Sequence, residues 1–217
     1  MLTRREVVTP HCRKTGLPEV TASAEEATGA SASSKGKLLN LMLYEAGWFA
    51  CVLGAAWGQG GAGAALAGTL LLIHLALARD RPSEVKIVAL CGAVGFVLDS
   101  TQSLTGRLSF TGPWLFPAGT GATAPVWVLM LWLQLGTTLR SSLAWLSRRY
   151  GLAAALGAVG GPVAFLAGER LGAATWGEPR WLTALSLAMV WGAATPLLVF
   201  VADRIGAGRP AGYRWPR

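Results

Sequence analysis

Four ionisable side chains, Glu45, His74, Asp99 and Arg140, stand inside long apolar stretches of the sequence. Ionisable groups are costly inside a bilayer, so each of them is a candidate functional residue. A carboxylate and a guanidinium neutralise each other at close range, and a histidine beside them can bridge the pair or relay a proton. A single buried carboxylate can instead couple to an ion or a proton, as in membrane transporters.

Three of these residues are expected at one depth. Glu45, His74 and Arg140 lie about five to seven residues from the same end of their apolar stretches, which is roughly 10 Å at the rise of a helix. With Asn40 they form a predicted inner polar layer, in which Glu45 pairs with Arg140 around a pocket for an anionic headgroup or a small solute. The alternative is structural, with Arg140 extending to the headgroups and Glu45 and His74 serving stability.

Asp99 belongs to a second polar group near the opposite face. The run from Asp99 to Ser103 is unusually polar for a helix end in lipid, and a long connection with several aromatic and proline residues follows it. We expect an outer cleft formed by Asp99, Gln102, Arg107 and Glu169. The alternative is that Asp99 caps its own helix end or binds loop amides.

Sequence patterns of known catalytic sites are absent. The chain contains no HExxH, GxSxG or phosphate-binding loop, and its three cysteines have no metal-ligand spacing. We therefore predict no catalytic residue, no metal and no cofactor.

The elements that carry these residues are six apolar blocks, each near the roughly 20 residues that a helix needs to cross a bilayer. They cover about 39–57, 61–79, 85–102, 125–146, 151–170 and 181–202. Apolar residues make up 53% of the chain and charged residues 14%. The sequence thus predicts an all-α, polytopic membrane protein, a bundle of six transmembrane helices.

The orientation follows from the basic residues of the connections. Fifteen Lys and Arg residues fall on the side of the two termini and three on the other side. This asymmetry predicts that both termini are cytoplasmic. The usage of Ala, Gly and Arg suggests a bacterial source, so we expect the inner membrane of a bacterium. The net charge of +8 does not indicate nucleic-acid binding, because the basic residues lie between apolar blocks rather than on one face.

Two tails flank the predicted membrane domain at 38–202. Residues 1–37 are rich in Ser, Ala, Gly and Thr, and we expect a disordered cytoplasmic tail or an extension upstream of the true start codon. Residues 203–217 are expected to be a short basic cytoplasmic tail.

Small residues recur in the fifth block at helical spacing, which favours close helix packing. The expected packing positions are Gly157, Gly160, Gly161, Gly168 and Gly172. Such a surface is also compatible with a homo-oligomer.

The chain resembles a bacterial membrane family, the domain of unknown function 2878. The resembling segments are LLNLMLYEAGWFACVLGAA (38–56), GFVLDS (95–100), PVWVLMLWLQLGTTLRSSLAWL (125–146) and LGAVGGPVAFLAGERLGA (156–173). The chain departs from the family where Arg140-Ser141 replaces Asn-His, which weakens the prediction of an inner pocket. Because the genes of this family often neighbour those of fatty-acid-modifying enzymes, the resemblance implies membrane lipid and such enzymes as partners.

Three functions remain open from the sequence. The first is a non-enzymatic component that binds lipid or presents it to partner enzymes. The second is a small secondary transporter that uses Asp99 as its coupling group. The third is a lipid-modifying membrane enzyme, for which the sequence offers no nucleophile or metal set.

Overall fold

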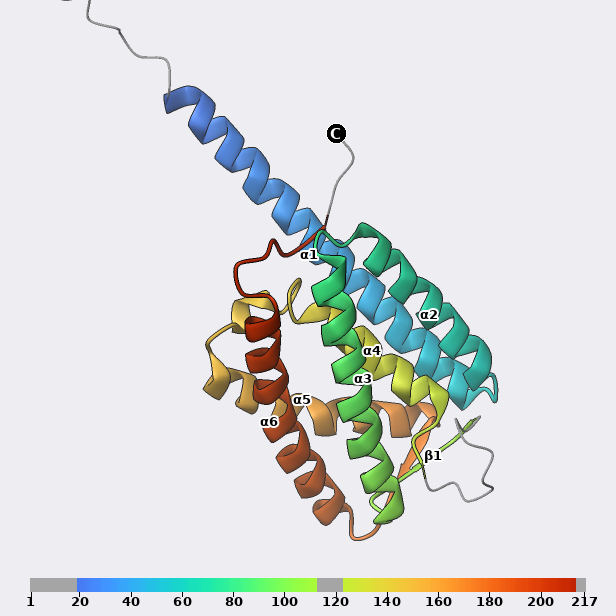
Figure 1. Ribbon diagram of the computed structural model, residues 1–217. Coiled ribbons are helices and arrows are strands. Elements are labelled where there is room, and N and C mark those ends of the chain that lie inside the picture. Colours follow the sequence, from blue (N-terminus) through green and yellow to red (C-terminus); the bar gives the residue numbers. More distant parts are fainter. Residues whose placement is uncertain (1–18, 113–122, 214–217) are drawn as a thin grey trace, which may run out of the picture.

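The computed structural model describes residues 19–112 and 123–213, with side chains from Ser34 onward. The described chain forms six α-helices, one short 3-10 helix (η1) and two short strands (Figure 1). The elements are α1 (Glu19–Ala56), α2 (Gly60–Leu77), α3 (Arg81–Leu104), β1 (Leu108–Phe110), α4 (Val126–Thr138), η1 (Ala144–Leu146), α5 (Tyr150–Leu171), β2 (Ala174–Trp176) and α6 (Arg180–Ile205). The predicted all-α fold class is confirmed.

Five helical segments are long and apolar enough to cross a membrane: residues 34–56 of α1, and α2, α3, α5 and α6. Large hydrophobic side chains cover their outward faces, among them Leu72, Val97, Val159 and Met189, each at least 60% exposed. In water such a surface would aggregate, whereas lipid covers it without cost. The chain is a multi-pass membrane protein.

The fourth helix is shorter than its apolar block. A span over 125–146 was expected, but α4 has 13 residues, or about 20 Å, and ends at Thr138. The hydroxyls of Thr137 and Thr138 bond back to the carbonyls of Gln134 and Leu135. Such bonds compete with the helical ladder and favour a helix end. The turns that follow are buried at Leu139, Arg140 and Ser141, as non-helical backbone at membrane depth must be.

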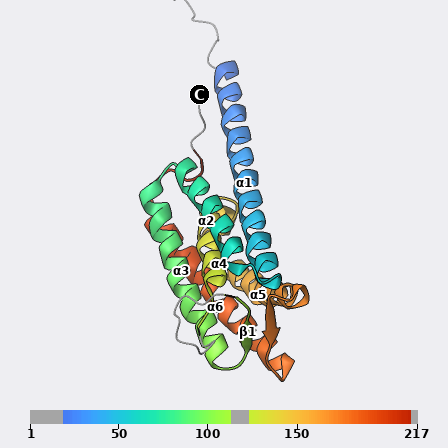
Figure 2. The same ribbon diagram turned by 90° about the vertical axis from the view of Figure 1, so that its right-hand side faces the viewer.

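Helix α4 lies at the centre of the bundle, in contact with α1, α2 and α3. Helices α1 and α2 form a hairpin, and α5 packs along α6 while running steeply across the direction of α3 (Figure 1). The N-terminal part of α1 extends beyond the other helices (Figure 2). That part and the C-terminal end of the described chain lie at the same end of the molecule (Figure 1).

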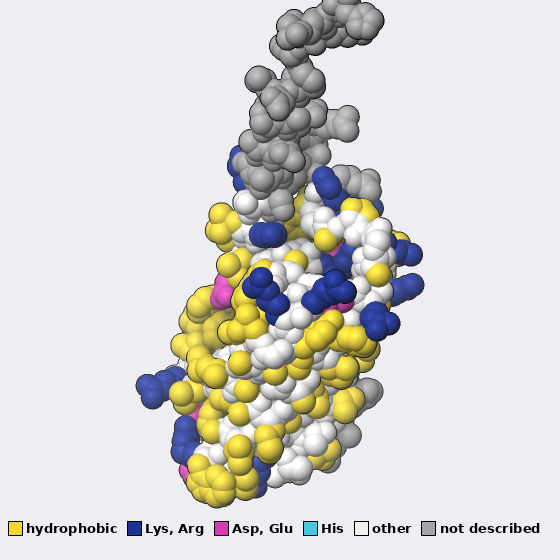
Figure 3. Space-filling view, turned by 90° about the vertical axis from the view of Figure 1, so that its left-hand side faces the viewer, with side chains coloured by type: hydrophobic (Ala, Val, Ile, Leu, Met, Phe, Trp, Pro, Cys, Tyr) yellow, Lys and Arg dark blue, Asp and Glu magenta, His cyan; other side chains and the backbone are white. Residues whose placement is uncertain are grey.

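The basic residues lie mainly at the end of the molecule that carries the N-terminal part of α1. Figure 3 shows Lys and Arg side chains gathered toward the end from which α1 protrudes, with a largely apolar surface below them. This separation matches the pattern from which the orientation is predicted.

Two three-residue strands join the connections at the opposite end. β1 pairs with β2 in antiparallel register, with Leu108 opposite Trp176 and Phe110 opposite Ala174. The sheet ties the α3–α4 connection to the α5–α6 connection. It was not predicted, since a pairing of three residues leaves almost no pattern in a sequence.

The glycines of α5 do not act as one packing stripe. Gly157 and Gly161 lie against Thr195 and Trp191 of α6, where a Cβ atom would collide with these side chains. No atom lies within 4 Å of a Cβ placed at Gly160 or Gly168. Gly172 ends the helix in the left-handed conformation, with a φ of 92°. Of the five glycines expected to pack, Gly157 and Gly161 therefore pack against α6, because they lie on the side of α5 that α6 covers.

Helical structure extends into both predicted tails. Helix α1 begins at Glu19, inside the stretch expected to be disordered, while residues 1–18 lie outside the described part. At the other end α6 continues to Ile205, and Tyr213 forms a bridge with Ala78. The end of the described chain is thereby fastened to the end of α2.

Candidate functional site

The structure brings together three of the four residues of the predicted inner polar layer. Asn40, His74 and Arg140 are buried within one network of hydrogen bonds. Glu45 is exposed on α1, and the expected pair between Glu45 and Arg140 is not formed. The acidic partners are Asp80 and Glu84 instead. We call the assembled set the inner cluster: Asn40, His74, Asp80, Glu84, Arg140 and Tyr213.

Charges in the inner cluster are compensated at short range. Nη1 of Arg140 lies 3.1 Å from Oδ2 of Asp80 and 3.4 Å from Oε1 of Glu84. The other oxygen of Glu84 lies 3.4 Å from Nε2 of His74. On the far side of the ring, the Tyr213 hydroxyl lies 2.8 Å from Nδ1 of His74. Four segments of the chain are tied together in this way.

Asn40 holds the broken end of α4. Its Oδ1 accepts hydrogen bonds from the Ser142 amide and hydroxyl, at 3.2 and 2.7 Å. Its Nδ2 donates to the Thr137 carbonyl at 3.1 Å. The backbone donor at Ser142 fixes the orientation of the amide. Nδ2 therefore faces Nδ1 of His74, which must act as an acceptor, and the proton of the imidazole lies on Nε2 toward Glu84.

Two members outside the spanning segments have shifted pKa values. The pKa of Asp80 is lowered, chiefly by the hydrogen bond from Ser83 and also by the Arg140 guanidinium. Burial raises the pKa of Tyr213 to about 12, so its hydroxyl remains a neutral hydrogen-bonding group. Both shifts favour the protonation states that hold the network together.

The inner cluster is chemically saturated. None of its buried side-chain atoms is without a partner in the described part of the chain. A network whose buried atoms all have partners rigidifies the elements that it joins. We therefore assign the inner cluster to the structure of the bundle.

Sequence reasoning missed Asp80 and Glu84 because it placed the third helix at 85. The signal was present in Asp80-Arg81-Pro82-Ser83, since an aspartate followed by proline marks a helix start. Asp80 caps α3 by accepting from the Ser83 amide, which brings Glu84 into the first turn.

The four residues of the predicted outer cleft make contacts with different parts of the described structure. Gln102 accepts a hydrogen bond from Ser186 of α6, and Glu169 binds the Arg180 guanidinium and the Trp176 amide. The Arg107 carbonyl accepts from Gly177 and Thr183 beside β1. Of the four, Asp99 lines the cavity that is described next.

This Asp99 cavity lies among α1, α3, α4, α5 and α6 and measures about 60 Å³. A water molecule needs roughly 10–15 Å³ measured in this way, so the space suits a slim group rather than a compact ligand. The cavity is partly open, and its surface is mostly apolar. Its lining comprises Tyr44, Trp48, Val52, Asp99, Trp127, Val128, Leu131, Trp132, Leu135, Ala164, Phe165, Gly168, Ala174 and Trp191.

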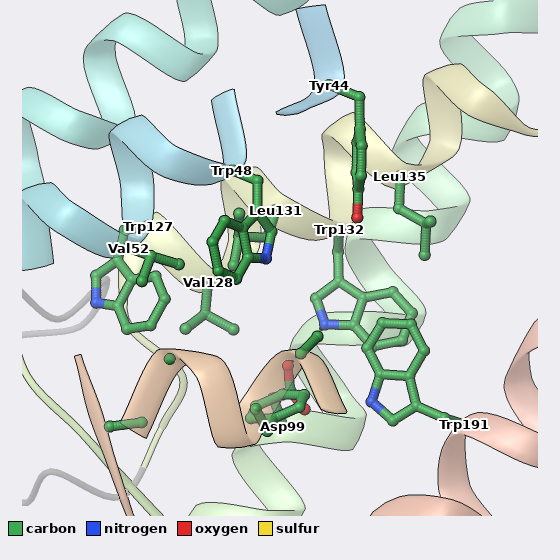
Figure 4. Close-up of a pocket in the computed structure, with 14 residues that line it drawn as sticks. Tyr44, Trp48, Val52, Asp99, Trp127, Val128, Leu131, Trp132, Leu135 and Trp191 are labelled. Carbon is green, nitrogen blue, oxygen red and sulfur yellow. Dashed lines mark hydrogen bonds between the residues drawn. The ribbon is translucent and has the colours of Figure 1, made fainter. Parts of the chain in front are cut away.

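Asp99 has one bound oxygen and one without a partner among the described residues (Figure 4). The residue is 1% exposed, and its Oδ2 accepts a hydrogen bond of 2.7 Å from Nε1 of Trp132. Within the described residues, no group lies within hydrogen-bond distance of Oδ1. The Nε1 of Trp191, in the same cavity, is likewise buried without a partner in that part of the chain.

Two tryptophans define the wall beside Asp99. The rings of Trp132 and Trp191 are stacked, with centroids 4.4 Å apart and planes inclined by 22°. Gly95, one turn before Asp99 on α3, leaves the space in which the Trp132 indole lies. A side chain at position 95 would push the indole off α3, away from its hydrogen bond with Asp99.

The cavity thus combines an aromatic and aliphatic surface with one vacant acceptor and one vacant donor. Buried polar atoms in folded proteins nearly always have partners, so two unpartnered atoms on residues that line this cavity make it a candidate binding site. A metal is a poor fit, since no group of three His, Cys, Asp or Glu residues within 34–112 and 123–213 is placed to hold one. The arrangement fits an apolar molecule that carries one polar group.

Comparison with known proteins places the chain in a family without supplying a function. No curated protein and no solved structure matches it. A family described as "Protein of unknown function (DUF2878)" matches residues 37–197. The match covers all six helices apart from the first part of α1 and the last turns of α6. The chain belongs to this family.

Proposed function

We propose that this membrane protein binds a lipid in the Asp99 cavity and presents it to partner enzymes without altering it. The observation that carries the proposal is the vacant Oδ1 of Asp99 inside an apolar, aromatic cavity. A carboxylate oxygen in such a place is stabilised by a hydrogen-bond donor, and in the described chain the protein provides one for Oδ2 only.

The lining favours a chain-like ligand. On α1 the cavity is bordered by Tyr44, Trp48 and Val52, which follow one helical face at intervals of four residues. On α5 it is bordered by Ala164, Phe165 and Gly168. A narrow, partly open gap between two apolar helix faces accepts an acyl or isoprenoid chain from the bilayer.

The two unpartnered polar atoms of the cavity define which polar group the lipid must carry. Oδ1 of Asp99 requires a donor, and Nε1 of Trp191 requires an acceptor. A hydroxyl group can serve either atom, because it donates one hydrogen bond and accepts others. We infer a lipid with a hydroxyl or a similar donor–acceptor group as the preferred ligand.

Identification of copurified lipid tests the proposal. The full chain is purified in detergent, and bound lipid is extracted and measured by mass spectrometry against the bulk membrane lipid. We expect one lipid class to be enriched with wild type and lost with Gly168→Leu, whose side chain fills the cavity. The matched control is Gly160→Leu, two turns earlier on α5, where a Cβ has open space and the residue is exposed.

Equal lipid content in wild type, Gly168→Leu and Gly160→Leu would overturn the assignment of the cavity. The variant Asp99→Asn tests the polar contact separately, because it keeps the shape of the side chain and replaces one of its two acceptor oxygens with an amide group. We expect this variant to bind the lipid more weakly while its unfolding temperature stays close to that of wild type.

The lipid profile of a deletion strain tests the role in the cell. Wild-type protein should restore the fatty-acid or headgroup pattern, and the Asp99→Asn variant should not. An unchanged profile under several growth conditions would exclude a role in lipid metabolism, including the presentation of lipid to fatty-acid-modifying enzymes.

A second candidate is a small secondary transporter. Its support is the same vacant carboxylate oxygen, since intramembrane carboxylates also carry coupling protons. Liposomes that contain the protein and a trapped pH dye distinguish the two functions. Proton movement on imposing a solute gradient, abolished by Asp99→Asn, would favour transport, and its absence together with lipid enrichment would favour binding.

We also propose that both termini face the cytoplasm of a bacterial inner membrane, on the strength of the basic residues at that end. In a chain whose native cysteines are replaced by alanine, Gln59→Cys and Arg149→Cys mark opposite ends of the bundle. A membrane-impermeant maleimide added to intact cells should label position 59 and not position 149. The reverse labelling would invert the topology.

A further inference from the structure

We propose that the molecule has a second binding site, a basic groove that binds the phosphate of an anionic lipid headgroup or of a free phosphate compound. The groove lies between the end of α6, the connection 139–149 and the C-terminal segment, and measures about 710 Å³. Its charged lining consists of Arg140, Arg148, Asp203, Arg204 and Arg209. It is separate from the Asp99 cavity, with which it shares no lining residue.

Two of the four guanidinium groups have no ion-pair partner among the described residues. Arg140 is bound by Asp80 and Glu84, and Arg209 lies 3.5 Å from Asp80. For Arg148 and Arg204 the described residues provide no carboxylate within ion-pair distance. The groove therefore presents a net positive charge to whatever enters it.

The single acid of the groove is engaged in holding the backbone. Oδ2 of Asp203 accepts hydrogen bonds from the Arg148 amide at 3.2 Å and from the Tyr150 hydroxyl at 3.1 Å. Arg148 has a φ of 61°, the left-handed region that glycine adopts freely and other residues do not. An arginine kept in a strained turn by a dedicated hydrogen bond indicates that its position is used, since strain concentrates at functional sites.

The surroundings favour phosphate at the membrane surface. Arg204 lies over the Phe200 ring, with the guanidinium carbon 4.8 Å from the ring centroid. Leu139 and Ala202 add apolar surface to the same groove, and Trp145 of the neighbouring η1 is 47% exposed. The groove opens at the end of the bundle where Lys and Arg side chains gather (Figure 3). Guanidinium groups bind phosphate oxygens in a bidentate manner, and the apolar floor suits the glycerol and first chain carbons of a lipid.

Binding of small probes to the full chain in detergent tests the site. The probes are dihexanoyl phosphatidylglycerol, dihexanoyl phosphatidylcholine and inorganic phosphate, each titrated at low and at high salt. We expect phosphatidylglycerol to bind at least tenfold more tightly than phosphatidylcholine, and its binding to weaken as salt rises. Binding of phosphatidylglycerol but not of phosphate would identify a lipid headgroup, and similar binding of both would identify a free phosphate compound.

The variants Arg148→Gly and Arg204→Gln remove the two uncompensated charges. Arg148→Gly also relieves the left-handed backbone, so its unfolding temperature should equal or exceed that of wild type. We expect at least a tenfold loss of affinity in the double variant. The matched control is Arg149→Gln, the exposed neighbour that does not line the groove, which should change affinity by less than twofold.

Two results would overturn the proposal: no binding of any probe by wild type, or an equal loss in the double variant and in Arg149→Gln. Gly168→Leu separates the two sites, since it fills the Asp99 cavity and should leave binding in the groove unchanged. The lipid-binding test of the Asp99 cavity does not depend on the result for the groove, so the two proposals can be accepted or rejected separately.

Discussion

The indole N–H of Trp132 on α4 donates a hydrogen bond of 2.7 Å to the carboxylate of Asp99 on α3. Both residues are buried, at 2% and 1% exposure. The bond therefore joins the central helix to its neighbour and at the same time engages one oxygen of Asp99. The second oxygen is left for a ligand, so a single contact contributes both to the packing of the bundle and to the proposed site.

Removing the donor should destabilise the bundle. Trp132→Phe keeps an aromatic ring but leaves the buried carboxylate without its partner, which costs about 1–3 kcal/mol. We expect a lower unfolding temperature in detergent. Trp191→Phe is the control, because the Trp191 N–H has no partner in the described chain and its loss should cost less. Equal losses in the two variants would show that the hydrogen bond to Asp99 contributes nothing.

A methyl group at Gly95 should disturb the same contact from the other side. In Gly95→Ala the new Cβ would occupy the place of the Trp132 indole. We expect a loss of stability of roughly 1–3 kcal/mol and a change in tryptophan fluorescence. Gly160→Ala, on an open face of α5, should be neutral or gain up to about 1 kcal/mol of helix propensity. A neutral Gly95→Ala would mean that the indole can move without cost.

The depth of polar residues in the helices was predictable. Asn40, His74 and Arg140 meet because the ends of apolar stretches fix the height of a side chain, at about 1.5 Å per residue. The neighbour that each side chain contacts was not predictable from its depth, because depth does not give the direction in which the side chain points. Glu45 has nearly the right depth, yet it points outward, and its expected place beside Arg140 is taken by Glu84.

The helix end at Thr138 was not predictable from hydropathy. Apolar residues continue beyond it, and an apolar run records contact with lipid or core rather than backbone conformation. The break depends on Asn40, far away in the sequence, which binds the backbone on both sides of it. The residues of the predicted outer cleft are directed to different helices for a related reason. Asp99 and Gln102 are three residues apart on α3, but Asp99 faces α4 whereas Gln102 faces α6.

Asn40 should therefore be a critical residue for the end of α4. Asn40→Ala leaves the Ser142 amide without its acceptor and the Thr137 carbonyl without its donor, at a cost of about 1–3 kcal/mol for each buried group. Hydrogen exchange should increase at residues 137–143 and remain unchanged in α6. As a control, Thr101→Ala removes an exposed hydroxyl that bonds only within its own helix, and it should change stability by less than about 0.5 kcal/mol. Unchanged exchange at 137–143 in the Asn40 variant would contradict the role given to this side chain.

Acid should weaken the bundle partly through Asp80. Its pKa lies below the ordinary value of 3.8 in the folded chain, because the charged form accepts a hydrogen bond from Ser83 and lies beside Arg140. A carboxyl group whose pKa is lower when folded stabilises the fold above its unfolded pKa, and this stabilisation is lost as the pH falls through the folded value. Unfolding temperatures between about pH 3 and pH 6 should therefore fall less steeply for Asp80→Asn than for wild type, from a lower starting point. Glu45→Gln removes an exposed carboxylate that has no ion pair in the described structure, and it should follow the wild-type curve. If the curves of wild type and Asp80→Asn were parallel throughout this range, the pair formed by Asp80 and Arg140 would not contribute to the acid sensitivity of the fold.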